Sequence, residues 1–189
     1  MNQHGAESRP EESGLPADGI DPDAPDFVYD EFAWFPENCA EYDLPWGGSA
    51  HVERVDVPVR DAGNVSMLRW GSGHPEVVFL HGGAQNAHTW DTVALAMGQP
   101  AALAVDLPGH GRSLWRSDGR YDPHSNAEAV LTALRDMLDR SVLLVGMSLG
   151  GLTANRVAAE APELVHRLVE VDGGSYRTEK TCQAENIAH

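Results

Sequence analysis

Short apolar runs alternate with helical stretches between residues 51 and 172 of the chain. The first two runs alternate apolar and polar positions, as half-exposed strands do, and a turn sequence separates them. The four later runs are almost continuously apolar, which is typical of strands buried on both faces of a parallel sheet. The predicted strands are residues 51–57, 65–71, 76–81, 101–106, 142–146 and 167–172.

Three segments between these strands have the spacing of helices that bury one face. In the longest of them, Ala127, Val130, Leu131 and Leu134 recur three and four residues apart. The predicted helices are residues 88–98, 124–139 and 149–162. Strands and helices that alternate in this way predict an α/β fold, with a mostly parallel twisted sheet flanked by helices on both faces.

The N-terminal part of the chain has a different composition. Residues 1–26 are rich in Pro, Gly, Glu and Asp and hold few large apolar side chains, so we expect this segment to be disordered. Residues 27–46 instead contain seven aromatic rings among acidic residues. Those rings either attach an N-terminal arm to the domain or border a substrate pocket. The predicted division is an arm at 1–46 and a partial α/β domain at 47–189.

The charge of the chain is concentrated in the same N-terminal part. The formal net charge of the 189 residues is −16. Residues 1–45 hold 12 acidic side chains against Arg9 alone, which leaves a net charge of −5 for the rest. A phosphate backbone would be repelled by this balance, so nucleic acid is excluded as the expected ligand.

The two cysteines, Cys39 and Cys182, are far apart and lack the spacing of metal ligands. Both are expected to be reduced thiols, and no metal or other cofactor is predicted. The first residues lack a cationic stretch followed by an apolar one, and no window approaches the roughly 18 apolar residues of a membrane span. We therefore expect a soluble, cytoplasmic protein that does not bind membranes.

The sequence Gly-Met-Ser-Leu-Gly at residues 146–150 follows a predicted buried strand and opens a predicted helix. A sharp turn between strand and helix holds a serine hydroxyl above the sheet, and glycines on both sides avoid collisions across the turn. The helix N-terminus then offers N–H groups and a positive dipole end to a developing oxyanion. Ser148 is therefore predicted to be a nucleophile, with the N–H of Leu149 as one oxyanion donor.

A glycine-rich loop begins at His81, directly after the predicted strand 76–81. An oxyanion hole takes its second N–H donor from a loop after an earlier strand. We assign this donor to Gly83, because the loop precedes the serine turn in the order that such a site requires. A plain glycine turn with no catalytic role remains the alternative for this loop.

A third glycine-containing loop spans residues 106–113. Its Asp106 and His110 could be mistaken for a catalytic acid and base. Their spacing suits a compact loop whose side chains bond to its own backbone, since Pro108 fixes one backbone angle and the two glycines permit positive ones. A structural role is predicted for both side chains.

The order and approximate spacing of these three loops resemble those of the α/β-hydrolase superfamily over roughly residues 51–175. The resemblance implies an eight-stranded, mostly parallel sheet and a triad of serine, acid and histidine. It also implies the roles given above to Ser148, Gly83 and Leu149. Esterases, lactonases, C–C bond hydrolases and cofactor-free haloperoxidases share this fold, so the resemblance names no substrate.

The acid and the histidine of the triad normally follow the seventh and eighth strands, whereas residues 167–172 form the sixth. The last two strands, the cap, the acid and the histidine are therefore expected beyond residue 189. Asp172 is a candidate acid, and His189 is the one later histidine. Three earlier histidines are predicted to have surface or packing roles: His88, His124 and His166.

The predicted function is hydrolysis of a small-molecule ester, lactone or similar carbonyl compound through an acyl-serine at Ser148. A serine without a positioned base is a weak nucleophile, so the chain is expected to be an incomplete hydrolase. The alternative is a non-catalytic binding protein on the same scaffold. Related lyase or peroxidase chemistry is a third reading. The exposed edge of the sixth strand is a candidate contact for an oligomer.

Overall fold

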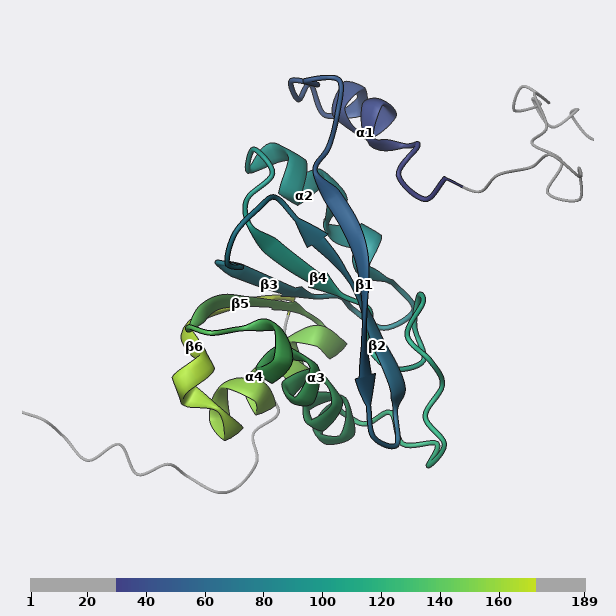
Figure 1. The fold of residues 1–189 in the computed structure, drawn as a ribbon, viewed down its shortest axis with the longest axis vertical. Coiled ribbons are helices and arrows are strands. Elements are labelled where there is room, and N and C mark those ends of the chain that lie inside the picture. Colours follow the sequence, from purple (N-terminus) through teal and green to yellow (C-terminus); the bar gives the residue numbers. More distant parts are fainter. Residues whose placement is uncertain (1–29, 173–189) are drawn as a thin grey trace, which may run out of the picture. The chain divides into compact units, whose positions relative to one another are not determined.

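A computed structural model describes residues 30–172, which form a six-stranded sheet with helices on both faces (Figure 1). The chain divides into two units, Met1–Ala33 and Trp34–His189, and the sheet belongs to the second. The disorder predicted for residues 1–26, and also Cys182, lie outside the described residues.

All six predicted strands are present. They run in the spatial order β1-β2-β4-β3-β5-β6. The pairs β1–β2 and β2–β4 are antiparallel, whereas β4, β3, β5 and β6 are mutually parallel. The strand bounds are β1 Val52–Val59, β2 Gly63–Trp70, β3 Val77–Leu80, β4 Ala102–Val105, β5 Val142–Met147 and β6 Val165–Val171. The sheet is thus mostly parallel, as predicted, with an antiparallel hairpin at one edge.

The three predicted helices are also present, one of them in a different form. The segment predicted as a single helix at 88–98 is a 3₁₀ turn followed by a short α-helix. Asn86 explains the start of that turn, because its side-chain oxygen accepts a 2.9 Å hydrogen bond from the N–H of His88. The helix bounds are α1 Phe35–Glu41, η1 Ala87–Trp90, α2 Asp91–Ala96, α3 Pro123–Met137, α4 Leu149–Glu160 and η2 Pro162–Leu164.

The core lies mainly between the sheet and the helices α3 and α4. Alternate residues of β3 divide between the two faces of the sheet. Val78 and Leu80 belong to the buried cluster that includes Leu134 of α3 and Val157 of α4. Phe79 faces the other way and stacks on Trp90, with ring centroids 4.9 Å apart.

The short helix α1 was not predicted, since seven residues carry little helical periodicity. It packs on the domain through Phe35, whose ring lies 5.1 Å from that of Trp70, and through the buried free thiol of Cys39. Trp34 and Tyr42 of the same segment are exposed. Phe35 therefore attaches this part of the aromatic segment to the sheet.

β6 is the last strand in the sheet order, and it pairs with β5 along its length. Its apolar residues Val169 and Val171 are 39% and 41% exposed. The exposed edge expected for the sixth strand is therefore observed among the residues that the structure describes.

Candidate active site

Ser148 occupies a sharp turn between β5 and α4 and is exposed. Its φ is +47° and its ψ is −113°, a conformation that L-residues rarely adopt. A Cβ atom added at Gly146 would lie 2.4 Å from the carbonyl oxygen of Gly150, and one added at Gly150 would lie 2.2 Å from that of Leu80. The turn that holds Ser148 therefore requires glycine at both positions.

The backbone of this serine is tied to both neighbouring elements. Its N–H donates a 3.1 Å hydrogen bond to the carbonyl of Val171 on β6, and its carbonyl accepts a 3.0 Å bond from Leu152 in the first turn of α4. Leu149 is the first residue of α4, where N–H groups have no acceptor within the helix. The N–H of Leu149 is thus in a position to donate to a ligand beside Ser148.

The glycine-rich loop after β3 lies against the serine. A Cβ atom added at Gly82 would be 3.5 Å from the Cβ of Ser148. A Cβ atom at Gly83 would meet no atom within 4 Å, so this residue borders open space. Ala84 turns the loop with a φ of +60°. The structure therefore places the loop that contains Gly83 beside Ser148.

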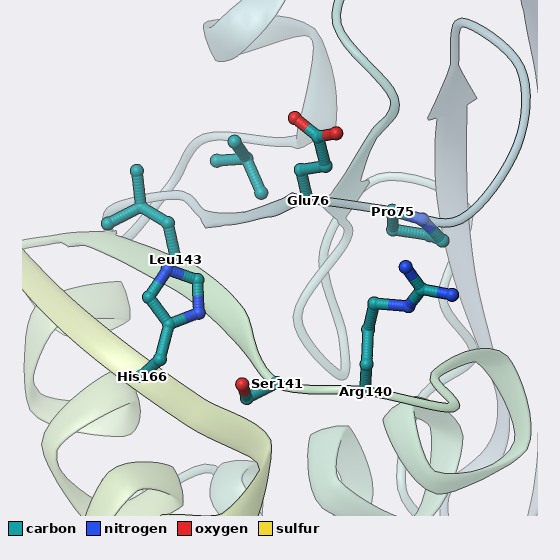
Figure 2. Close-up of a pocket in the computed structure, with 7 residues that line it drawn as sticks. Pro75, Glu76, Arg140, Ser141, Leu143 and His166 are labelled. Carbon is teal, nitrogen blue, oxygen red and sulfur yellow. The ribbon is translucent and has the colours of Figure 1, made fainter.

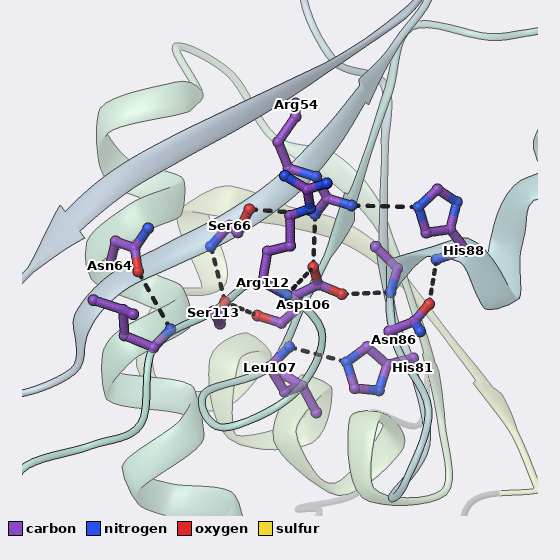
Figure 3. Close-up of polar contacts among 12 residues, drawn as sticks. Arg54, Asn64, Ser66, His81, Asn86, His88, Asp106, Leu107, Arg112 and Ser113 are labelled. Carbon is purple, nitrogen blue, oxygen red and sulfur yellow. Dashed lines mark hydrogen bonds and ion pairs between the residues drawn. The ribbon is translucent and has the colours of Figure 1, made fainter. Parts of the chain in front are cut away.

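Two side chains fix the ends of this loop to the segment after β4 (Figure 3). At one end, Nε2 of His81 accepts a 3.0 Å hydrogen bond from the N–H of Leu107. At the other end, Oδ1 of Asp106 accepts a 2.6 Å bond from the N–H of Ala87. Both ends of the glycine-rich loop are thus bonded to the segment that follows β4.

His81 is fully buried and has one tautomer that satisfies both of its contacts. Because Nε2 accepts from Leu107, the proton resides on Nδ1, which donates a 2.7 Å bond to the carbonyl of Gly82. Burial lowers the pKa of His81 below 6.5, and nearby His110 lowers it further, while the bond to Gly82 acts in the opposite direction. The ring is therefore held neutral at the start of the glycine-rich loop.

Asp106 has the structural role that was predicted for it. Its buried carboxylate pairs with Arg54 at 2.6 Å and also accepts a 3.0 Å bond from the N–H of Arg112. Its backbone carbonyl accepts from the hydroxyl of Ser113 at 2.6 Å. Figure 3 shows Arg54 between this carboxylate and His88. The carboxylate closes its own loop and has no contact with Ser148.

Three other histidines of the described range have side-chain partners away from the serine. His88 pairs with Asp91 at 2.7 Å, and His124 lies 3.3 Å from Glu128. His110 contacts the carbonyl of Pro108, within its own loop. These contacts do not involve Ser148, and His189 lies outside residues 30–172.

A hollow of about 320 Å³ lies at the N-terminal ends of the parallel strands, whereas Ser148 lies at their C-terminal ends (Figure 2). Val77, Leu143 and His166 line it, and they stand at the beginnings of β3, β5 and β6. Ser148 follows the end of β5. The hollow is therefore separate from the serine turn, and His166 is placed away from the candidate nucleophile.

Residues 77–184 match the model of the alpha/beta hydrolase family. The chain belongs to this family. Esterase Rv0045c of Mycobacterium tuberculosis (strain ATCC 25618 / H37Rv) is 54% identical over 143 residues, which are 76% of this chain and 46% of that protein. Pimeloyl-acyl-carrier-protein methyl ester esterase of Aeromonas salmonicida (strain A449) is 37% identical over 109 residues, 57% of this chain and 41% of that protein.

The fold comparison agrees with the sequence comparison. A crystal structure of esterase Rv0045c from Mycobacterium tuberculosis matches this chain with a TM-score of 0.69 at 53% identity. The match covers 77% of this chain and 50% of that one. The chain thus spans about half the length, or less, of the hydrolase-family relatives that it matches.

Sequence reasoning gave no role to Arg54, His81 or Gln85 in this hydrolase fold. Arg54 pairs with a residue 52 positions away, which no local pattern reveals. His81 could have been noticed as a polar residue at the end of an apolar strand. Gln85 belongs to the glycine-rich loop, and its side-chain oxygen accepts a 2.8 Å bond from the N–H of Gly82, a contact that the residue types of the loop do not indicate.

Two further features concern cofactors and membranes. Within residues 30–172, no group of three or more His, Cys, Asp or Glu side chains is arranged to hold a metal ion. No helix in the same range combines the length and apolar character that a membrane crossing needs.

Proposed function

We propose that this chain provides the nucleophile and the oxyanion hole of an ester hydrolase. Ser148 is the nucleophile, and the N–H groups of Leu149 and Gly83 bind the oxyanion. The observation that carries this proposal is the strained backbone of Ser148 at the β5–α4 turn, with Gly82 in contact beside it. Strain of this kind persists where the surrounding structure enforces it, and it is concentrated at active sites.

The reaction proceeds in two steps. Oγ of Ser148 attacks the ester carbonyl, its proton passes to a base, and the carbonyl oxygen becomes an oxyanion between the two N–H groups. The C–O bond to the alcohol then breaks, and the alcohol leaves with a proton, which yields an acyl-serine. Water attacks this acyl group in the same way, releases the acid and restores the hydroxyl.

The relatives support an ester as the substrate class. Two of the relatives that this chain matches are named esterase and methyl ester esterase. The more general expectation of a lactone or similar carbonyl compound is less well supported by these names. Lyase or peroxidase chemistry has no support among the relatives described here. Cytoplasmic location stays a prediction from the sequence.

Residues 30–172 do not identify the base and the acid that would act with Ser148. Asp172 follows Val171, whose carbonyl accepts the N–H of Ser148, so its backbone lies next to the serine turn. It is exposed and has a φ of +50°. Asp172 therefore stays a candidate acid, and the base is expected from a segment outside residues 30–172.

The proposal is tested by ester hydrolysis with the full chain. Even without its base, we expect Ser148 to react with a p-nitrophenyl ester, because the leaving group is activated and the oxyanion hole retains part of the rate. The expected result is a burst of nitrophenol that approaches one equivalent per chain, since deacylation is slower than acylation. Ser148→Ala should abolish the burst. Ser141→Ala, at the beginning of β5, is the matched control and should retain it. A folded chain without a burst, or a burst that survives in Ser148→Ala, contradicts the proposal and favours a binding role.

A further inference from the structure

Gln85 is a residue of the glycine-rich loop that follows β3. Its Oε1 accepts a 2.8 Å hydrogen bond from the N–H of Gly82, and its own N–H donates a 3.3 Å bond to the carbonyl of Gly82. The two residues therefore form a closed pair. The bond also fixes the orientation of the carboxamide, since an N–H donor requires the oxygen and not the nitrogen as its partner.

This closed pair determines which backbone donors of the loop remain available. The N–H of Gly82 is taken by Gln85, and the carbonyl of Gly82 also accepts from Nδ1 of His81. Both polar groups of Gly82 are thus engaged within the protein. The next N–H belongs to Gly83, at a position that borders open space.

The carboxamide also lies close to the nucleophile. A Cβ atom added at Gly82 would be 2.8 Å from Oε1 of Gln85 and 3.5 Å from the Cβ of Ser148. Gly82 therefore lies between the two side chains with no room for one of its own. A change at Gln85 acts directly on the peptide groups that face Ser148.

We propose that Gln85 is a positioning residue that sets the oxyanion hole. By engaging the N–H of Gly82 it holds the turn through Ala84 in one conformation and leaves the N–H of Gly83 for the substrate oxygen. This role rests on the proposed function of Ser148. The preorganisation of a donor accounts for its effect on rate, since removal of one oxyanion donor typically lowers rates by about 10²–10³.

Two substitutions and one matched control separate positioning from a general effect on stability. Gln85→Met keeps the side-chain length but removes the acceptor, whereas Gln85→Glu retains an acceptor oxygen. Gln99 provides the control, because its Oε1 also accepts a 2.8 Å bond from a backbone N–H, that of His51, far from the serine turn. Gln99→Met removes the same kind of bond at a remote site.

The first readout is independent of activity. Amide hydrogen exchange of Gly82, followed by ¹H–¹⁵N NMR on the full chain, should accelerate at least about tenfold in Gln85→Met, because its hydrogen bond is lost. It should stay slow in Gln85→Glu and in Gln99→Met. Equal exchange of the Gly82 amide in the wild type and in Gln85→Met overturns the proposal.

The second readout is the limiting rate at which a fluorophosphonate modifies Ser148, since this reaction also places an oxyanion in the hole. We expect a fall of about tenfold or more in Gln85→Met and less than about twofold in Gln99→Met, at equal melting temperatures. If Gln85→Met and Gln99→Met are modified at equal rates although the Gly82 amide exchanges faster in Gln85→Met, the positioning role of Gln85 is overturned, while the proposed function of Ser148 stands. A wild-type chain that is not modified overturns the proposed function as well, and the role of Gln85 with it.

Discussion

At the scale of single residues, the serine turn depends on glycines that cannot be replaced. A Cβ atom at position 150 would lie 2.2 Å from the carbonyl oxygen of Leu80. Backbone atoms cannot move aside as a flexible side chain can, so β3 and α4 would have to separate. The packing of the turn against the neighbouring strand thus enforces the strain at Ser148.

We expect Gly150→Ala to lower the free energy of unfolding by about 1–3 kcal/mol, as overpacked core substitutions do. Urea denaturation of the full chain measures this difference. Gly47→Ala is the control, because a Cβ atom there would meet nothing within 4 Å, and its stability should change by less than about 0.5 kcal/mol. Equal stability of the two variants would show that the turn is looser than described.

His81 leads to a prediction about pH. Burial lowers its pKa in the folded chain from the ordinary 6.5, so below pH 6.5 the unfolded chain binds a proton that the folded chain does not. The free energy of unfolding should therefore fall as the pH falls below 6.5, by up to about 1.4 kcal/mol per pH unit until the folded pKa is reached.

Urea denaturation at several pH values between 5 and 8 tests this, with His81→Gln as the comparison. The variant should lose this part of the pH dependence and keep the contribution of the other groups. Wild type and variant curves that run parallel across this range would be evidence against a buried neutral His81.

The sequence predicted Ser148 because its signal is local, with glycines two residues away on each side and a buried strand before them. The roles of Arg54 and Gln85 were not predictable in this way. Arg54 meets Asp106 only because β1, β2 and β4 are neighbours in the sheet. The role of Gln85 depends on the turn at Ala84. The φ of Ala84 is positive, which its residue type does not predict.

At the scale of elements, the loop after β4 organises the loop after β3. Asp106 accepts hydrogen bonds from the N–H groups of Ala87 and Arg112 and pairs with Arg54 from β1. Its side chain is 1% exposed and that of Arg54 is 12% exposed. Removal of the carboxylate would leave a largely buried cation and two N–H groups without this acceptor.

We expect Asp106→Ala to lower the free energy of unfolding by about 3–5 kcal/mol, the usual cost of breaking a buried ion pair. Asp139→Ala, at a side chain that is 55% exposed, is the control and should change stability by less than about 0.5 kcal/mol. Thermal or urea unfolding measures both. A similarly small change at Asp106 would mean that the two loops hold together without it.

The strands β3, β4 and β5 were predicted closely because strands buried on both faces are apolar almost without interruption. The prediction that residues 167–172 are a buried strand was wrong in its burial, because β6 has only one neighbouring strand among the described residues and is mostly exposed. The helices α3 and α4 were predicted for a related reason, since each buries one apolar stripe. The helix α1 has only seven residues, and its burial depends on the contact of Phe35 with Trp70. That contact is a tertiary feature, and the sequence offered only the choice between an attached arm and a pocket border.

At the scale of the whole molecule, β6 is the outermost strand of the sheet within residues 30–172 and exposes apolar side chains. β6 pairs with β5, and Val169 and Val171 are partly exposed beside it. Edges of this kind invite pairing with another chain. The parallel pairing of the later strands was predicted from the sequence, whereas the antiparallel pairing of β2 with β4 was not, because β1 and β2 have no distinguishing local signal beyond their half-exposed pattern.

We expect the full chain to associate with itself as its concentration rises, and Val169→Lys to weaken this association by placing a charge at the edge. Sedimentation velocity over a range of concentrations measures the effect. Thr132→Lys, on the exposed side of α3, is the control and should associate like the wild type. Wild-type chain that stays monomeric at every concentration would contradict the role of this edge.

The central claim is that Ser148 is a nucleophile beside a preformed oxyanion hole, and covalent capture tests it most directly. The full chain is treated with a fluorophosphonate, and the adduct is located by mass spectrometry of its peptides. We expect one phosphonyl group per chain, on Ser148, and none in a folded Ser148→Ala variant. Unmodified Ser148 in a folded wild-type chain, or modification that persists in Ser148→Ala, would contradict it.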